Sequence, residues 1–183
     1  MTGLDTDAAL VEVLKLEYQA LKTEQTQRIT TRDNLIYPLL AVIGGIAVGI
    51  LQAGAVDLLL VLPPACAVFG WKHLDTDRAI LAARRYIEHR LAPRLKNLTR
   101  NYVLGWEVYH RTDRRRRQRK TIQLAVDMLT FVVPGALALA LWAPSGDHSV
   151  WAWAGFYVDL VVVCVLEWQM LVHANLRPEE TTT

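Results

Sequence analysis

The sequence predicts an all-α membrane protein, with four transmembrane helices arranged as two hairpins that are joined by a basic cytoplasmic helical segment. Every Lys and Arg lies outside four apolar stretches, and fifteen of the twenty basic residues fall between Lys72 and Lys120. The short segments Gln52–Val56 and Pro144–Val150 contain no Lys or Arg. Because the basic residues of short loops stay on the cytoplasmic side, we expect these two turns outside, and both chain ends and the basic segment in the cytoplasm. The expected location is the cell inner (plasma) membrane.

The four apolar stretches define the expected spans, since about 20 apolar residues suffice to cross the hydrocarbon core. The double proline Pro63-Pro64 lies inside the second stretch and predicts a kink there. Tryptophans near the second outer turn favour the headgroup layer, where amphipathic rings collect; they are Trp142, Trp151 and Trp153. We place the spans at Leu35–Gln52, Val56–Trp71, Thr121–Ala143 and Val150–His173.

The organisation that follows has five segments. Residues 1–33 form a cytoplasmic amphipathic helix, and residues 34–72 form the first transmembrane hairpin. Residues 73–120 form the basic cytoplasmic helical linker, residues 121–173 the second transmembrane hairpin, and residues 174–183 a disordered cytoplasmic tail.

Both cytoplasmic helical segments carry apolar residues at helical spacing. In the first segment they are Leu10, Leu14, Tyr18 and Leu21; in the second they are Ile80, Ile87, Leu91, Leu95, Leu98 and Tyr102. We expect Pro38 to bend the first helix where it enters span one, and Pro93 to kink the second. The two helices are expected to pack on each other within one subunit, with a coiled-coil contact between subunits as the alternative.

Small residues recur at intervals of four along span one, which allows close approach of a second helix backbone. That second helix is either span two of the same hairpin or a neighbouring subunit, so a homo-oligomer is one expectation. The residues are Ala41, Gly45, Gly49 and Ala53.

Acidic residues inside the spans are the candidate functional residues, because a charged carboxylate at the bilayer centre costs about 2.5 kcal/mol or more unless it is paired, hydrated or protonated. Asp127 and Glu167 lie at similar depth on spans three and four and are candidates to share a proton. Asp159 lies near the middle of span four with no basic residue at its depth. It is either functional, in proton transfer or as a polar pore lining, or a neutral carboxyl bonded to a neighbouring helix. Asp57 lies near the outer end of span two, where water reaches it, and we assign it no role.

A run of basic residues immediately precedes span three. A juxtamembrane cluster of this kind anchors the span and attracts anionic lipid headgroups, and we favour that interpretation over contact with nucleic acid or a nucleotide. A cytoplasmic protein partner is a further open alternative. The residues are Arg114, Arg115, Arg116, Arg117, Arg119 and Lys120.

Sequence motifs of catalysis are missing from the chain. It has no His-Glu-x-x-His, glycine-rich phosphate loop or Gly-x-Ser-x-Gly, and its five histidines are scattered. We therefore expect a protein that is not an enzyme, with no catalytic, cofactor-binding or metal-binding residues and no cofactor.

The segments Leu16–Lys22 and Arg28–Asp33, followed by a hairpin and a further helix, resemble the small helical effector modules of bacterial nucleotide-second-messenger defence systems, which occur with two or four spans. The resemblance covers about the first hundred residues and lies in the layout. It implies a membrane-disrupting or pore-forming effector that a partner gates, and it carries over no catalytic residue. The second hairpin is a departure from the two-span type.

Three functional hypotheses remain open from the sequence. The first is an oligomeric membrane protein that forms or gates an ion pathway, with the small-residue face as the subunit contact and the acidic residues along the path. The second is a non-conducting scaffold that presents a basic cytoplasmic helical platform to lipid or to a protein partner. The third is a small dimeric transporter with the two hairpins as an internal repeat.

Overall fold

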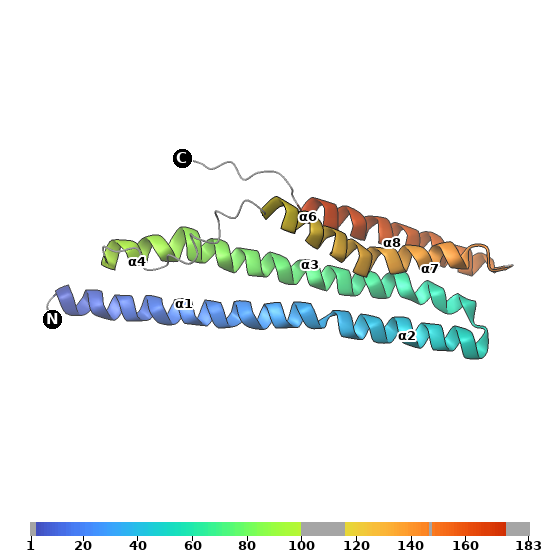
Figure 1. Ribbon diagram of the computed structural model, residues 1–183, viewed down its shortest axis with the longest axis horizontal. Helices are drawn as coiled ribbons and strands as arrows, with labels where there is room; N and C mark the ends of the chain where they lie inside the picture. Colours follow the sequence, from blue (N-terminus) through green and yellow to red (C-terminus); the bar gives the residue numbers. More distant parts are fainter. Residues whose placement is uncertain (1–2, 100–115, 147, 175–183) are drawn as a thin grey trace. The chain divides into compact units, whose positions relative to one another are not determined.

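The computed structural model describes residues 3–99, 116–146 and 148–174, and within these ranges the chain is helical without strands, which confirms the all-α prediction. Four helical stretches are long and apolar enough to cross a membrane. In chain order (Figure 1) the elements are α1 (Gly3–Asn34), α2 (Ile36–Ala53), the 3₁₀ helix η1 (Val56–Val61), α3 (Leu62–Tyr86), the π-helical turn η2 (Ile87–Leu91), α4 (Ala92–Thr99), α6 (Arg116–Asp127), the π-helical turn η3 (Met128–Val132), α7 (Val133–Trp142) and α8 (Val150–Ala174).

The chain divides into two units. We call the first, Met1–Asp33 with Asp75–Arg114, the hairpin unit, and the second, Asn34–Leu74 with Arg115–Thr183, the four-span unit. Helix α3 contributes to both, because the division falls between Leu74 and Asp75.

The hairpin unit is an antiparallel pair made by α1 with the second half of α3, η2 and α4. Its core consists of Leu14 from α1 packed against three residues of η2 and α4. Tyr18, Leu21 and Leu98 pack around these residues. The two amphipathic segments that flank the first apolar hairpin therefore bury their apolar faces against each other within one subunit. The three residues from η2 and α4 are Ile87, Leu91 and Leu95.

Polar contacts run the length of this pair and fix its antiparallel direction. The Tyr86 hydroxyl donates to Glu17 Oε1 at 2.6 Å, and the Gln25 side-chain amide donates to the main-chain carbonyl of Ile80 at 3.3 Å. The Glu17 contact raises the pKa of the Tyr86 phenol above its ordinary value, since the protonated hydroxyl makes the hydrogen bond.

Prolines lie in the first turns of α2 and α3 in the four-span unit. Pro38 cannot donate to the carbonyl of Asn34, the residue where α1 ends, and α2 begins at Ile36. The predicted bend at Pro38 is thus an interruption of the helix just before it. Pro63 and Pro64 lie in the first turn of α3, where a helix tolerates proline. The predicted mid-span kink is therefore a change from 3₁₀ to α geometry.

The two remaining prolines inside helices each follow a π-helical turn. Turn η2 ends two residues before Pro93, and turn η3 ends two residues before Pro134. A π turn widens the helix locally, which accommodates the ring and the missing N–H of the following proline. At the other end of α2, Gly54 adopts φ 65° and donates its N–H to the Ile50 carbonyl at 2.9 Å. This left-handed cap ends α2 and starts the tight turn.

Apolar residues of α2, α3, η3, α7 and α8 make the core of the four-span unit, and Leu59 and Leu60 of η1 pack against it. Many more lie on its outside, as expected for helices whose surroundings are lipid. The core residues are Leu39, Leu62, Cys66, Leu74, Phe131, Val132, Ala138, Leu139, Val163, Leu166 and Met170.

Several sequence-based expectations lie outside the described residues. They include the tail from residue 175 onward, Arg114, Arg115 and Tyr102. Arg116, Arg117 and Arg119 belong to α6 by their backbone, and nothing is described of their side chains.

Replacing Leu91 by Ala tests the core of the hairpin unit. Leu91 is 1% exposed and packs with Leu14, so its truncation should cost about 2–5 kcal/mol through lost burial and the cavity left behind. Hydrogen exchange of the full chain in nanodiscs should show faster exchange throughout α1 and α4. The matched control is Leu81→Ala, because Leu81 is 37% exposed, and exchange there should change little. Equal effects of the two substitutions would contradict the assigned core.

Candidate functional site

Asp159 lies on the inward face of α8. The buried residues of this helix recur at intervals of four and three and so form one stripe, consisting of Asp159, Val163, Leu166 and Met170. Asp159 is only 7% exposed. Among the described residues, no side chain forms a hydrogen bond or ion pair with its carboxyl. The structure thus places the candidate of span four in the interior of the four-span unit.

Close packing fixes the register of α8 against η1 and α3. A Cβ on Gly70 would lie 2.9 Å from Leu166 Cδ1, and a Cβ on Gly155 would lie 3.9 Å from Leu60 Cδ1. Leu60 precedes Gly70 in the chain, and their partners Gly155 and Leu166 follow in the same order. The segment formed by η1 and α3 therefore runs parallel to α8. Helix α7 packs on the same stripe: a Cβ on Gly135 would meet Val163 Cγ2 and the Pro63 Cα, each at 3.4 Å.

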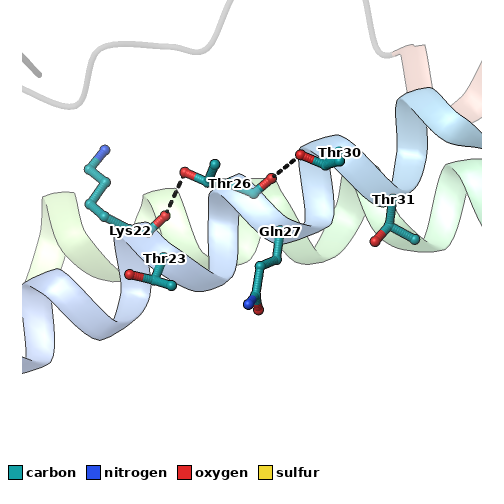
Figure 2. A pocket seen from close by; sticks show the side chains of 6 residues that line it. All are labelled: Lys22, Thr23, Thr26, Gln27, Thr30 and Thr31. Atoms are coloured by element: carbon teal, nitrogen blue, oxygen red, sulfur yellow. Dashed lines mark hydrogen bonds between the residues drawn. The ribbon is translucent and has the colours of Figure 1, made fainter.

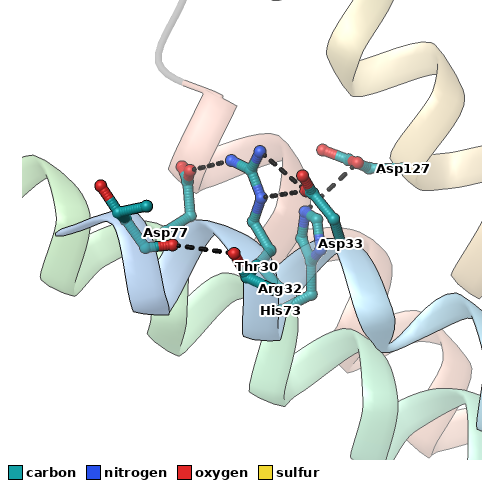
Figure 3. A network of polar contacts seen from close by, with 7 residues as sticks. Thr30, Arg32, Asp33, His73, Asp77 and Asp127 are labelled. Atoms are coloured by element: carbon teal, nitrogen blue, oxygen red, sulfur yellow. Dashed lines mark hydrogen bonds and ion pairs between the residues drawn. The ribbon is translucent and has the colours of Figure 1, made fainter. Parts of the chain in front are cut away.

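Asp127 contacts a histidine of α3. His73 Nε2 lies 3.3 Å from Asp127 Oδ1, and the two side chains are 11% and 19% exposed (Figure 3). The His73 ring also contacts Phe131, with centroids 5.1 Å apart. Glu167, the partner expected for Asp127, lies on an exposed position of α8. His73 was missed in the sequence, although it follows Cys66 by seven residues and Gly70 by three, which is the spacing of an inward helical face.

Asp57, to which the sequence analysis gave no role, accepts a hydrogen bond from Trp142. The indole Nε1 donates to Asp57 Oδ1 at 2.9 Å, and the Trp142 side chain is fully buried. The His148 ring stacks on the indole with the ring centroids 3.7 Å apart. Its Nε2 atom lies 3.0 Å from the main-chain carbonyl oxygen of Trp142. Asp57, Trp142 and His148 together form what we call the turn-end cluster.

Aromatic rings from α8 complete the surroundings of the turn-end cluster. Trp153 and Phe156 contact the Trp142 ring at 5.4 and 5.5 Å between centroids. The three tryptophans of this region, which we expected in the headgroup layer, therefore differ from one another. Trp142 belongs to the core, Trp153 is half-buried, and Trp151 is 86% exposed.

The small-residue series of α2 is divided between two environments. A Cβ on Gly49 would lie 2.6 Å from Leu58 Cδ1, so this residue packs against η1 of the same hairpin. Around Gly45, by contrast, no described heavy atom lies within 4 Å of a built Cβ, and Ala41 and Ala53 are exposed. Of the basic residues before span three, Lys120 has a described side chain, and it is half-buried.

The hairpin unit carries its own ion pairs and an open groove. Arg32 binds Asp77 at 3.0 Å and Asp33 at 3.1 Å (Figure 3). The groove lies along α1 (Figure 2), and two of its hydroxyls, those of Thr26 and Thr30, donate to carbonyls four residues earlier at 3.0 and 3.1 Å. It is lined by Lys22, Thr23, Thr26, Gln27, Thr30 and Thr31.

Within the described ranges, no group of three or more His, Cys, Asp or Glu residues is placed to hold a metal ion. No protein-family model, curated protein or solved structure matches the chain. The functional assignment therefore depends on the geometry of the chain itself.

Replacing Asp57 by Ala tests the turn-end cluster. The buried Trp142 N–H would lose its acceptor, and an unsatisfied buried donor costs about 1–3 kcal/mol. The melting temperature of the purified protein in detergent should fall. Asp57→Asn is the matched control, since its amide oxygen still accepts the N–H, and it should restore most of the loss. If Asp57→Ala melts at the wild-type temperature, the hydrogen bond does not stabilise this end of the unit.

Proposed function

We propose that this protein is an oligomeric integral membrane protein that forms or gates an ion pathway. The proposed topology has four spans in the inner (plasma) membrane, with both chain ends and the basic segment in the cytoplasm, as basic residues in short loops favour. The hairpin unit would then be the cytoplasmic part that receives a signal, and the turn-end cluster would lie at the outer surface.

The observation that carries the proposal is the burial of Asp159. A carboxyl in the middle of a span is costly, and such residues generally face a bundle interior or a water-filled cavity and mark ion or proton routes. Asp159 faces the interior, and it has no described cationic partner that would give it a structural role as half of an ion pair.

Helix α2 supports the oligomeric part of the proposal. Only 6% of its apolar stretch is buried inside the protein, against 17–28% for the apolar stretches of the other three spans. The open positions around Gly45 leave a shallow face that a second helix backbone can approach closely, which is how helices associate where lipid offers no hydrophobic drive. A neighbouring copy of the same helix is the proposed occupant.

A flux measurement tests the pathway. Purified protein in liposomes should leak protons or potassium, and Asp159→Asn should change the leak several-fold because it removes the ionisable group in the interior. Asp33→Asn makes the same change at an exposed carboxyl of the hairpin unit and should leave the flux unaltered. Vesicles that stay tight with wild type and variant alike would favour the non-conducting scaffold, with the hairpin unit as its platform.

A substitution in α2 tests the subunit contact. Gly45→Leu fills the open face and should reduce the oligomeric fraction measured by crosslinking in nanodiscs or by mass photometry. Ala47→Leu introduces the same side chain at an exposed position on the other side of α2 and should leave assembly intact. An oligomer that survives Gly45→Leu would place the subunit contact on another helix.

A further inference from the structure

The double proline at the start of α3 leaves a main-chain carbonyl without its ordinary donors. The carbonyl of Leu60 would accept from the third or fourth residue after it in a 3₁₀ or α helix. Those residues are Pro63 and Pro64, neither of which has an N–H. The preceding carbonyl is different, because Leu59 accepts the N–H of Leu62. Leu60 therefore offers a strong hydrogen-bond acceptor inside a span, where water is scarce.

Asp159 lies at the level of this carbonyl. Gly155, one turn before Asp159, lies beside Leu60, and Leu166, two turns after it, lies beside Gly70. Interpolation between these two contacts on parallel helices places Asp159 beside the Pro63-Pro64 turn. The buried residues that make the core of the four-span unit, Leu62 and Val163 among them, are apolar. A carboxyl and a carbonyl that lacks its ordinary donors thus fall at the same level of the four-span unit.

We propose that α8 and the junction of η1 with α3 form an intramembrane proton-binding site, in which the protonated Asp159 carboxyl donates its O–H to the main-chain carbonyl of Leu60. A carboxylic acid is a donor and a carboxylate is not, so only the protonated form satisfies both groups. A carboxylate with a single carbonyl gives a metal ion too few oxygen ligands, since hard cations take about six or more. On release, the proton passes to water and the carboxylate retains the electron pair of the O–H bond.

The inference names the ion of the pathway proposed above and rests on that function for its role, although the site itself can be detected without any flux. In a resting subunit the pair would be neutral and closed. Conduction would require Asp159 to exchange its proton with water from one side of the bilayer or the other.

Infrared spectra of the full-length protein in nanodiscs, with isotope-labelled aspartate, test the site. At neutral pH the wild type should show the C=O band of a protonated carboxylic acid, and Asp159→Asn should remove that band completely. A C=O region of protonated carboxylic acids that is the same in both proteins would overturn the proposal, because the Asp159 carboxyl would then be ionised.

The carbonyl partner is tested by restoring its donor. Pro64→Ala supplies an N–H four residues after Leu60, so the carbonyl becomes a weaker acceptor and the acid band should move to higher frequency. Pro63→Ala supplies the donor one residue earlier and repeats the test if the first variant fails to fold. Pro38→Ala makes the same change in the first turn of α2 and should leave the band in place. A band that no proline substitution in α3 moves would overturn Leu60 as the partner.

The infrared and flux results separate the two proposals. An acid band with tight vesicles leaves the proton site standing and removes the pathway. A leak that Asp159→Asn alters, without an acid band in the wild type, leaves the pathway standing and removes the proton site.

Discussion

The lack of hydrogen-bonding solvent in hydrocarbon is the constraint on which the four-span unit depends. Every main-chain N–H and C=O in a span must find its partner inside the protein, which explains why the spans are helical over their described residues. It also explains where prolines occur. Pro38, Pro63 and Pro64 lie in first turns, and Pro93 and Pro134 follow widened π turns. Side chains obey the same rule, as the bond from buried Trp142 to Asp57 shows.

The positions of the spans and the packing of the hairpin unit could be predicted from the sequence because both depend on local periodicity. The predicted span Leu35–Gln52 differs from α2 by one residue at each end, and Leu14 meets Leu91 as the helical spacing implied. The polar pairs could not be predicted in this way. Asp57 and Trp142 are 85 residues apart, and the partner of Asp127 depends on which face of α3 turns inward. Depth along the spans, estimated from the sequence, paired Asp127 with Glu167. In the structure the inward face of α3 brings His73 to Asp127 instead.

The interior of the four-span unit is therefore chemically uneven. One end is tied by an aromatic and hydrogen-bonded cluster, and the other contains the pair of His73 and Asp127. Between them, Asp159 lies among leucines and valines beside the proline turn. Groups with satisfied partners generally stabilise a fold, and a group that lacks one is available to bind something else. Burial without a side-chain partner distinguishes Asp159 from the other acidic residues of the spans, since Glu167 is exposed and both Asp57 and Asp127 have partners.

The differing environments of the tryptophans give the molecule built-in optical reporters. Trp142 is fully buried and stacked on an imidazole ring, so its emission should be blue-shifted, partly quenched by His148 and insensitive to quenchers in water or lipid. Trp151 and Trp168 are 86% and 66% exposed and would meet the surrounding medium directly. Lipids brominated at chosen depths would therefore quench these two indoles while leaving Trp142 unquenched. Each of them would serve as a depth gauge for its own end of α8.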